Sequence, residues 1–228
     1  MPVACLLILG LPPLRQRLQS PVLLLGAALG NTGYWGLPMA LALLPPQALA
    51  PVIAYDLAGT VVTWTVGPLV LRGARAGRET LLSTLVASPA LQGFVLFAIL
   101  APTPWHGVLA QLLWWPARLV FWIALSLLGM RLGVGVKERT VVFSTGVPWA
   151  LSFKLLVVPL IVWLLATWLR LPPLDRAALV LQGAAPTALS VLLLAEAERQ
   201  AVALASTVVL LSTLSALVTV PLWWSVMR

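Results

Sequence analysis

Two segments that contain glycine and proline interrupt long apolar stretches of this chain, and they hold residue types suited to binding a small solute. Residues 30–38 read Gly-Asn-Thr-Gly-Tyr-Trp-Gly-Leu-Pro, and residues 182–187 read Gln-Gly-Ala-Ala-Pro-Thr. An interior proline removes a backbone donor and clashes with the preceding turn, and glycine lowers helix stability. We therefore predict that both segments are breaks in helices, each with its proline in the first turn of a second half-helix.

Broken helices free backbone groups, which are tolerated at membrane depth only where protein or a water-filled cavity satisfies them. If the second halves begin near residues 36 and 186, both electropositive N-terminal ends face the centre of the protein and favour an anion. The predicted substrate is therefore a small organic anion, such as a carboxylate. The predicted substrate-binding residues are Asn31, Thr32, Tyr34, Pro38, Gln182 and Pro186.

Two ionisable residues, Asp56 and Lys154, lie inside apolar stretches. Charged groups within a membrane are costly and often functional. For Asp56 we consider coupling to a proton or another cation, against a structural carboxyl held by hydrogen bonds. For Lys154 we consider a counter-charge to a carboxylate substrate, against a side chain that reaches toward the cytoplasm or pairs with Asp56.

The elements that must position these residues are membrane-spanning helices. Hydrophobic residues make up 61% of the 228-residue chain and charged residues 9%, whereas soluble domains are about a quarter charged. A span needs roughly 20 apolar residues. Seven stretches qualify, and they predict an all-α polytopic bundle: residues 21–44, 48–71, 81–101, 107–130, 141–169, 174–196 and 201–226. Residues 3–11 are too short to cross and are expected to be the tail of a helix whose beginning is absent.

The net charge of +8 fits loops next to lipid and not a nucleic-acid surface, because the basic residues form short clusters between apolar runs. Alternating the sides of successive spans places most of them on one side, which we predict to be cytoplasmic. That side holds Arg15, Arg17, Arg72, Arg75, Arg78, Arg131, Lys137, Arg139 and Arg199, and the other holds Arg170, Arg176 and Arg228.

The two interrupted helices occupy corresponding places in groups that run in opposite directions, which is the inverted-repeat pattern of many secondary transporters. We expect four parts. Residues 1–71 form an incomplete first repeat with transport-domain helices, and residues 72–80 form a cytoplasmic connection. Residues 81–131 hold the remaining scaffold helices, and residues 140–228 hold the transport-domain helices of the second repeat.

The chain lacks the residues that a disulfide, a metal site or a catalytic site would require. Cys5 is the single cysteine and His106 the single histidine, so the sequence predicts no disulfide, no metal cluster and no cofactor. An intramembrane enzyme would need paired aspartates, an activated nucleophile or a metal. Asp56 is the one acidic residue clearly inside a predicted span, and we therefore predict that the chain is not an enzyme.

The same segments carry a family resemblance. Residues 31–38, followed by Ala-Tyr-Asp at 54–56, resemble the auxin efflux carrier family, and residues 182–186 and 211–221 are similar to its second half. The resemblance implies ten helices in two inverted five-helix repeats, with a substrate site where the fourth and ninth helices cross at prolines. It places Asn31 and Pro38 at the first crossover, and Gln182 and Pro186 at the second. It implies transport of an auxin-like indole carboxylate or a dicarboxylate such as malate.

Against this family, the first two helices and most of the third are expected to be missing. The resemblance further implies elevator-like alternating access, a transport domain carried on a scaffold, and a homodimer. We expect the lipid bilayer of a plasma membrane, such as a bacterial inner membrane, as the environment, and a proton or sodium ion as the coupling partner. Two alternatives stay open: a sodium-coupled symporter of the bile-acid type, and an inactive truncated remnant or accessory membrane protein.

Overall fold

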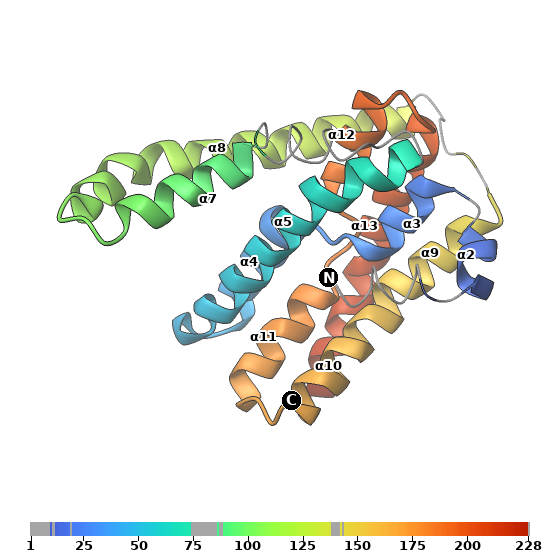
Figure 1. The fold of residues 1–228 in the computed structure, drawn as a ribbon. Coiled ribbons are helices and arrows are strands. Elements are labelled where there is room, and N and C mark those ends of the chain that lie inside the picture. The colour runs from blue at the N-terminus through green and yellow to red at the C-terminus, as the bar shows by residue number, and fades with distance from the viewer. Residues whose placement is uncertain are drawn as a thin grey trace.

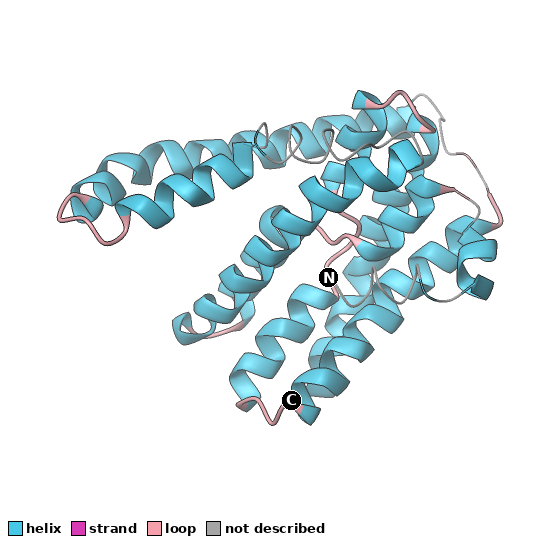
Figure 2. Ribbon diagram, in the orientation of Figure 1, coloured by secondary structure: helices cyan, strands magenta, loops and turns pink. Residues whose placement is uncertain are grey.

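The computed structural model describes residues 12–18, 20–73, 89–137 and 144–227, together with Gly10, Val86 and Val142. Within these residues the regular structure is entirely helical (Figure 2). The predicted all-α class is therefore confirmed for the described part of the chain. The one strand-like feature there is an isolated antiparallel bridge between Gly30 and Thr187.

The first broken helix begins after a short N-terminal helix, α2 (Pro12–Leu18). It consists of α3 (Pro21–Ala28), an unwound stretch, a π-helical turn η1 (Thr32–Gly36) and α4 (Leu37–Leu43). Pro21 stands at the first position of α3, where its missing N–H costs no helical hydrogen bond, whereas Pro38 at the start of α4 follows η1 without a break. A short 3₁₀ turn, η2 (Pro46–Ala48), leads into the long helix α5 (Leu49–Arg72).

Two helices, α7 (Pro89–Leu100) and α8 (His106–Lys137), follow in the middle of the chain. They are joined by a turn over residues 101–105 and project together away from the other helices (Figure 1). The 32-residue helix α8 continues back to the body of the protein and contacts α13 (Val202–Met227).

The second broken helix lies between two long runs. Before it, α9 (Gly146–Ser152), a π-helical turn η4 (Phe153–Val157) and α10 (Val158–Trp168) form one uninterrupted helical path. The broken helix consists of α11 (Pro173–Gly183) and α12 (Leu189–Ala197), separated by residues 184–188. Helix α13 then ends the described chain.

Three helical runs are long and apolar enough to cross a bilayer among the described residues: Pro46–Arg72, Gly146–Trp168 and Val202–Met227. They correspond to three of the seven predicted spans. The predicted spans at 21–44 and 174–196 are each divided into pieces too short to cross alone, because the chain unwinds within them. The predicted span at 81–101 lies partly outside the described residues. The seven-span count is therefore not confirmed.

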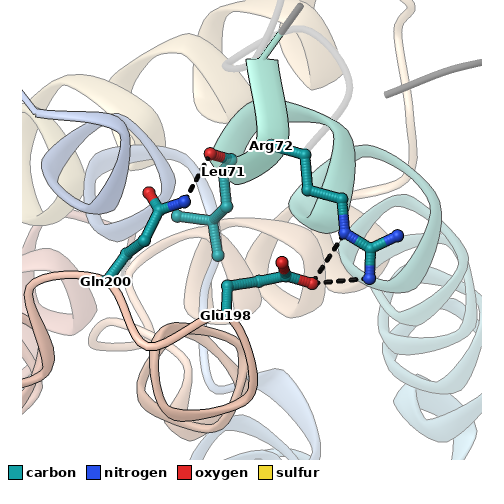
Figure 3. A network of polar contacts seen from close by, with 4 residues as sticks. All are labelled: Leu71, Arg72, Glu198 and Gln200. Carbon is teal, nitrogen blue, oxygen red and sulfur yellow. Dashed lines mark hydrogen bonds and ion pairs between the residues drawn. The ribbon is translucent and has the colours of Figure 1, made fainter. Parts of the chain in front are cut away.

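A polar clamp, formed by Arg72, Glu198, Gln200 and the carbonyl of Leu71, joins the C-terminal end of α5 to the residues after α12. Arg72, the last residue of α5, forms an ion pair with Glu198 at the end of α12, with an Nη2–Oε1 distance of 2.6 Å. The side chain of Gln200 donates a hydrogen bond of 3.0 Å to the carbonyl of Leu71 (Figure 3). The clamp fixes the end of α5 beside the turn between α12 and α13.

Candidate functional site

The two unwound segments cross each other and pair as a very short antiparallel ladder. The Asn31 N–H donates to the carbonyl of Pro186 at 2.7 Å, and the Ala188 N–H donates to the carbonyl of Leu29 at 3.0 Å. Leu29 and Ala188 both have extended backbone dihedrals. Each break thus satisfies backbone groups that the other break has freed, which is how an interrupted helix avoids unpaired polar groups in an apolar interior.

Side chains fix the second break from two further directions. Thr187, which is fully buried, donates its hydroxyl to the carbonyl of Gly26 in α3 at 2.8 Å. Its backbone N–H donates to the hydroxyl of Ser212 in α13 at 3.0 Å. These two buried bonds tie the second break to α3 and to α13.

A cavity of about 560 Å³ lies at the crossing, in the size range of small-molecule sites. Its wall includes the start of the second half of each broken helix. The lining residues are Gly30, Asn31, Thr32, Gly33, Tyr34 and Leu37 from the first; Ala188, Leu189, Ser190 and Leu193 from the second; Asp56, Gly59, Thr60, Thr63 and Trp64 from α5; and Ala117 from α8. The electropositive end of the nine-residue helix α12 and the start of η1 therefore border the same space.

Asp56 lies against the first break. The hydroxyl of Thr32 donates to Asp56 Oδ1 at 2.5 Å. A side-chain carbon added at Gly33 would lie 3.3 Å from the same carboxylate oxygen, so the absence of a side chain there lets the carboxylate approach the backbone. Asp56 is the one acidic residue among the described residues that line the cavity, and no Lys or Arg is among them.

Lys154 is buried in η4 and is not among the residues that line the cavity. Its side chain is 1% exposed, and its ammonium donates to the carbonyl of Gly183, the last residue of α11, at 2.7 Å. The described residues show no ion pair between Lys154 and Asp56. A direct role of Lys154 toward substrate stays a prediction.

The other predicted site residues fall into two groups. Asn31, Thr32 and Tyr34 line the cavity, whereas Gln182, Pro38 and Pro186 are not among the lining residues. Gln182 is fully buried beside Gly36, and neither polar atom of its amide has a hydrogen-bond partner in the described part of the chain. Contact of Gln182, Pro38 and Pro186 with a substrate stays a prediction.

The prolines stand in unequal places. Pro38 is in the first turn of α4, but α4 continues η1 without a break, so the second half of this broken helix begins at Thr32 and Pro38 lies in its second turn, not in the first as expected. Pro186 differs from the expectation: α12 starts only at Leu189, so this proline lies inside the unwound segment and supplies a carbonyl to the crossing. The first turn of the second half-helix instead contains Leu189 and Ser190.

The residues of α5 beyond Asp56 that line the cavity were not predicted from the sequence. Gly59, Thr60 and Thr63 follow Asp56 at offsets of three, four and seven residues and line the cavity with it. This spacing places side chains on one face of a helix, so a small polar stripe in an apolar helix was the available signal. Ser190 and Ser212 gave no comparable pattern.

Comparisons with known proteins give the wider context. Residues 121–224 match a family model described as membrane transport protein. An uncharacterized transporter of Methanocaldococcus jannaschii is 24% identical to this chain over 206 residues, which cover 88% of this chain and 66% of that protein. The match therefore extends over slightly less than two thirds of the length of this relative. No solved structure matches the chain.

Proposed function

We propose that this chain, which is similar to membrane transport proteins and resembles the auxin efflux carriers, is a secondary transporter for a small organic anion. The substrate would be an auxin-like indole carboxylate or a dicarboxylate, and it would bind at the crossing of the two broken helices. The family match is to transporters and not to enzymes. Alternating access would expose the crossing to each side of the membrane in turn.

The observation that carries this proposal is the cavity at the crossing. The starts of both second half-helices border it, through Asn31 and Thr32 on one and Leu189 and Ser190 on the other. Early backbone N–H groups of a helix have no carbonyl partner within that helix. Together with the helix dipole, these groups favour a negative charge. Tyr34 and Trp64 add aromatic surface to the lining, which suits an indole or another apolar body of a carboxylate.

Asp56 would couple transport to a proton. An ionised carboxylate at this place competes with a substrate anion, because it lies beside the first turn of the same half-helix. Protonation removes the competing charge, so proton and anion would bind together and cross as a neutral pair. The bond from Thr32 keeps the carboxyl group at the start of η1.

The inverted repeat would relate the two broken helices and the long helices that follow them. Support comes from the prolines of these long helices: Pro68 is the twentieth residue of α5 and Pro221 the twentieth of α13. Each long helix also contacts its partner break, since Asp56 bonds to Thr32 and Ser212 accepts from Thr187. These helices would form the moving transport domain of an elevator mechanism in a plasma membrane, with a homodimer as the proposed assembly.

Uptake into vesicles tests the function. The purified protein in liposomes is expected to accumulate radiolabelled indole-3-acetate or malate above empty liposomes. Asn31→Ala should lower this uptake about tenfold, which corresponds to ~1.4 kcal/mol of lost interaction. The control is Thr167→Ala, because the Thr167 hydroxyl bonds only to Trp163 in its own helix on an exposed face of α10. Uptake by Asn31→Ala equal to that of the control would overturn the site, and absence of carboxylate uptake by the wild type would overturn the substrate class.

A further inference from the structure

The C-terminal end of α11 attracts positive charge. A helix ends with carbonyl groups that have no partner in the next turn, and its dipole places a partial negative charge there. The N–H groups of Ala184 and Ala185 satisfy the carbonyls of Val180 and Gln182. The Gly183 carbonyl receives its hydrogen bond from outside the helix, from the ammonium of Lys154.

Packing closes this end of α11 to water. A side-chain carbon at Gly183 would lie 3.1 Å from Val162 and 3.4 Å from the backbone of Pro159, so α10 and α11 approach closely here. Lys154 and Gln182 are both buried, and the Gln182 amide oxygen is without a partner among the described residues. An ammonium and an unused carbonyl-type oxygen therefore belong to the same enclosed helix end.

Half-helix ends of this kind bind ions in other carriers. In secondary transporters with discontinuous helices, the C-terminal ends of half-helices and unwound carbonyls coordinate the coupling sodium ion. A sodium ion there is held by oxygen atoms of the backbone and side chains. In this chain a protein cation, at 2.7 Å from a carbonyl oxygen, already occupies such an end.

We propose that Lys154 is a built-in cation that takes the place of a coupling sodium ion at the end of α11. The helix end keeps the positive charge that it requires in every transport state, because the ammonium is covalently attached and cannot leave with the substrate. Transport of the anion therefore needs no sodium gradient. The part of this inference that concerns transport rests on the proposed function, whereas the part that concerns the cation site does not.

Thermal unfolding of the purified protein in detergent tests the cation site without any substrate. Wild type, Lys154→Ala and Lys154→Met are compared in the chlorides of N-methylglucamine, sodium, potassium, ammonium and methylammonium at equal ionic strength. The wild type should unfold at one temperature in all five. Lys154→Ala should unfold roughly 5 °C lower in the bulky N-methylglucamine salt and recover at least half of the loss in a small cation.

Two variants serve as controls. Lys154→Met fills the space with an apolar chain, so it should lose stability and gain nothing from any cation. Arg176→Ala removes a positive charge from the other end of the same helix, and its unfolding temperature should not depend on the cation.

Three results would overturn the inference. The first is a Lys154→Ala protein as stable as the wild type in the N-methylglucamine salt. The second is a lowered stability that no small cation restores, which would leave Lys154 with an ordinary packing role. The third is a wild type that sodium specifically stabilises, and this measurement remains decisive if Lys154→Ala does not fold.

Vesicle uptake supplies the transport arm. Wild-type uptake should be equal with sodium or N-methylglucamine outside, and uptake by Lys154→Ala should rise severalfold when sodium is supplied. Sodium-dependent uptake by the wild type would overturn the inference and favour a sodium symporter. Failure of all uptake would count against the proposed function alone, since the unfolding data decide the cation site independently.

Discussion

The two breaks that meet at the crossing differ in what they do with their polar groups. The first break presents polar groups to the cavity, through Asn31, Thr32 and Tyr34. The second break directs its polar groups into the protein, where Thr187 bonds to Gly26 and Ser212. Two segments with a similar content of glycine and proline thus have different physical roles, since one lines the cavity with polar groups and the other holds the crossing together.

Local composition explains the difference. The first break contains three glycines, and a side chain at Gly36 would overlap the amide of Gln182, so the backbone there is both pliant and closely packed. The second break consists largely of alanines, which are buried and leave no large side chain to fill the cavity. A pair of breaks therefore need not contribute equally to a site.

The largest effect on stability is expected for Thr187→Val, which keeps the shape of the side chain and removes its hydroxyl. The buried bond to Gly26 is lost, and unfolding should become easier by about 2 kcal/mol. The unfolding temperature should fall by roughly 4–8 °C. The matched control is Thr213→Val, because the Thr213 hydroxyl bonds only to Val209 within α13. Equal losses in the free energy of unfolding in the two variants would show that the second break does not hold the crossing together.

Asp56→Asn tests whether the first break presents its polar groups to the substrate. We expect a change of about tenfold in the apparent affinity for the anion. The amide keeps an acceptor for Thr32 but carries no charge, so the anion no longer has a competitor at the helix tip. Apparent affinity for the anion should rise about tenfold, or ~1.4 kcal/mol, and the dependence of uptake on pH should disappear. Asp175→Asn, in the first turn of α11, is the control. Unaltered pH dependence in Asp56→Asn would contradict proton coupling through this carboxyl.

The smallest effects are expected for two glutamines, and they have opposite signs. Gln182→Leu removes an amide without a partner in the described part of the chain and should raise stability by about 1 kcal/mol. Gln200→Leu removes the bond to the carbonyl of Leu71 and should lower stability by a similar amount. Chemical unfolding in detergent measures both.

Uptake by Gln182→Leu also decides whether Gln182 contacts the substrate. If uptake falls about tenfold in a protein that is more stable than the wild type, Gln182 binds substrate in a transport state other than the one described. Uptake at the wild-type level would assign Gln182 to packing alone, and Ser190 would then be the one polar side chain from α11 and α12 in the described cavity lining.

Much of the fold could be predicted because it depends on local properties. The long runs at residues 46–72, 146–168 and 202–227 follow from apolar length, and the breaks follow from glycine and proline. The π-helical turns η1 and η4 were not predicted. Such a turn differs from an α-helical turn by one extra residue, and no characteristic composition marks it in the sequence. Three of the six predicted binding residues line the cavity, and all three lie in the first break, whereas Pro38 of the same break does not line it.

The sequence by itself determined three things: that this chain belongs in a bilayer, at which residues its helices break, and which residues are costly to bury. These could be predicted because transfer free energy and backbone conformation are properties of single residues and their near neighbours. Tertiary structure alone decided which part of the protein the side chains of Asp56 and Lys154 face. Asp56 reaches the cavity because α5 packs against the first break, and Lys154 reaches the end of α11 because α10 and α11 pack together. In helices that are apolar on every side, no periodicity marks an inner face, so only the packing of whole helices could select it.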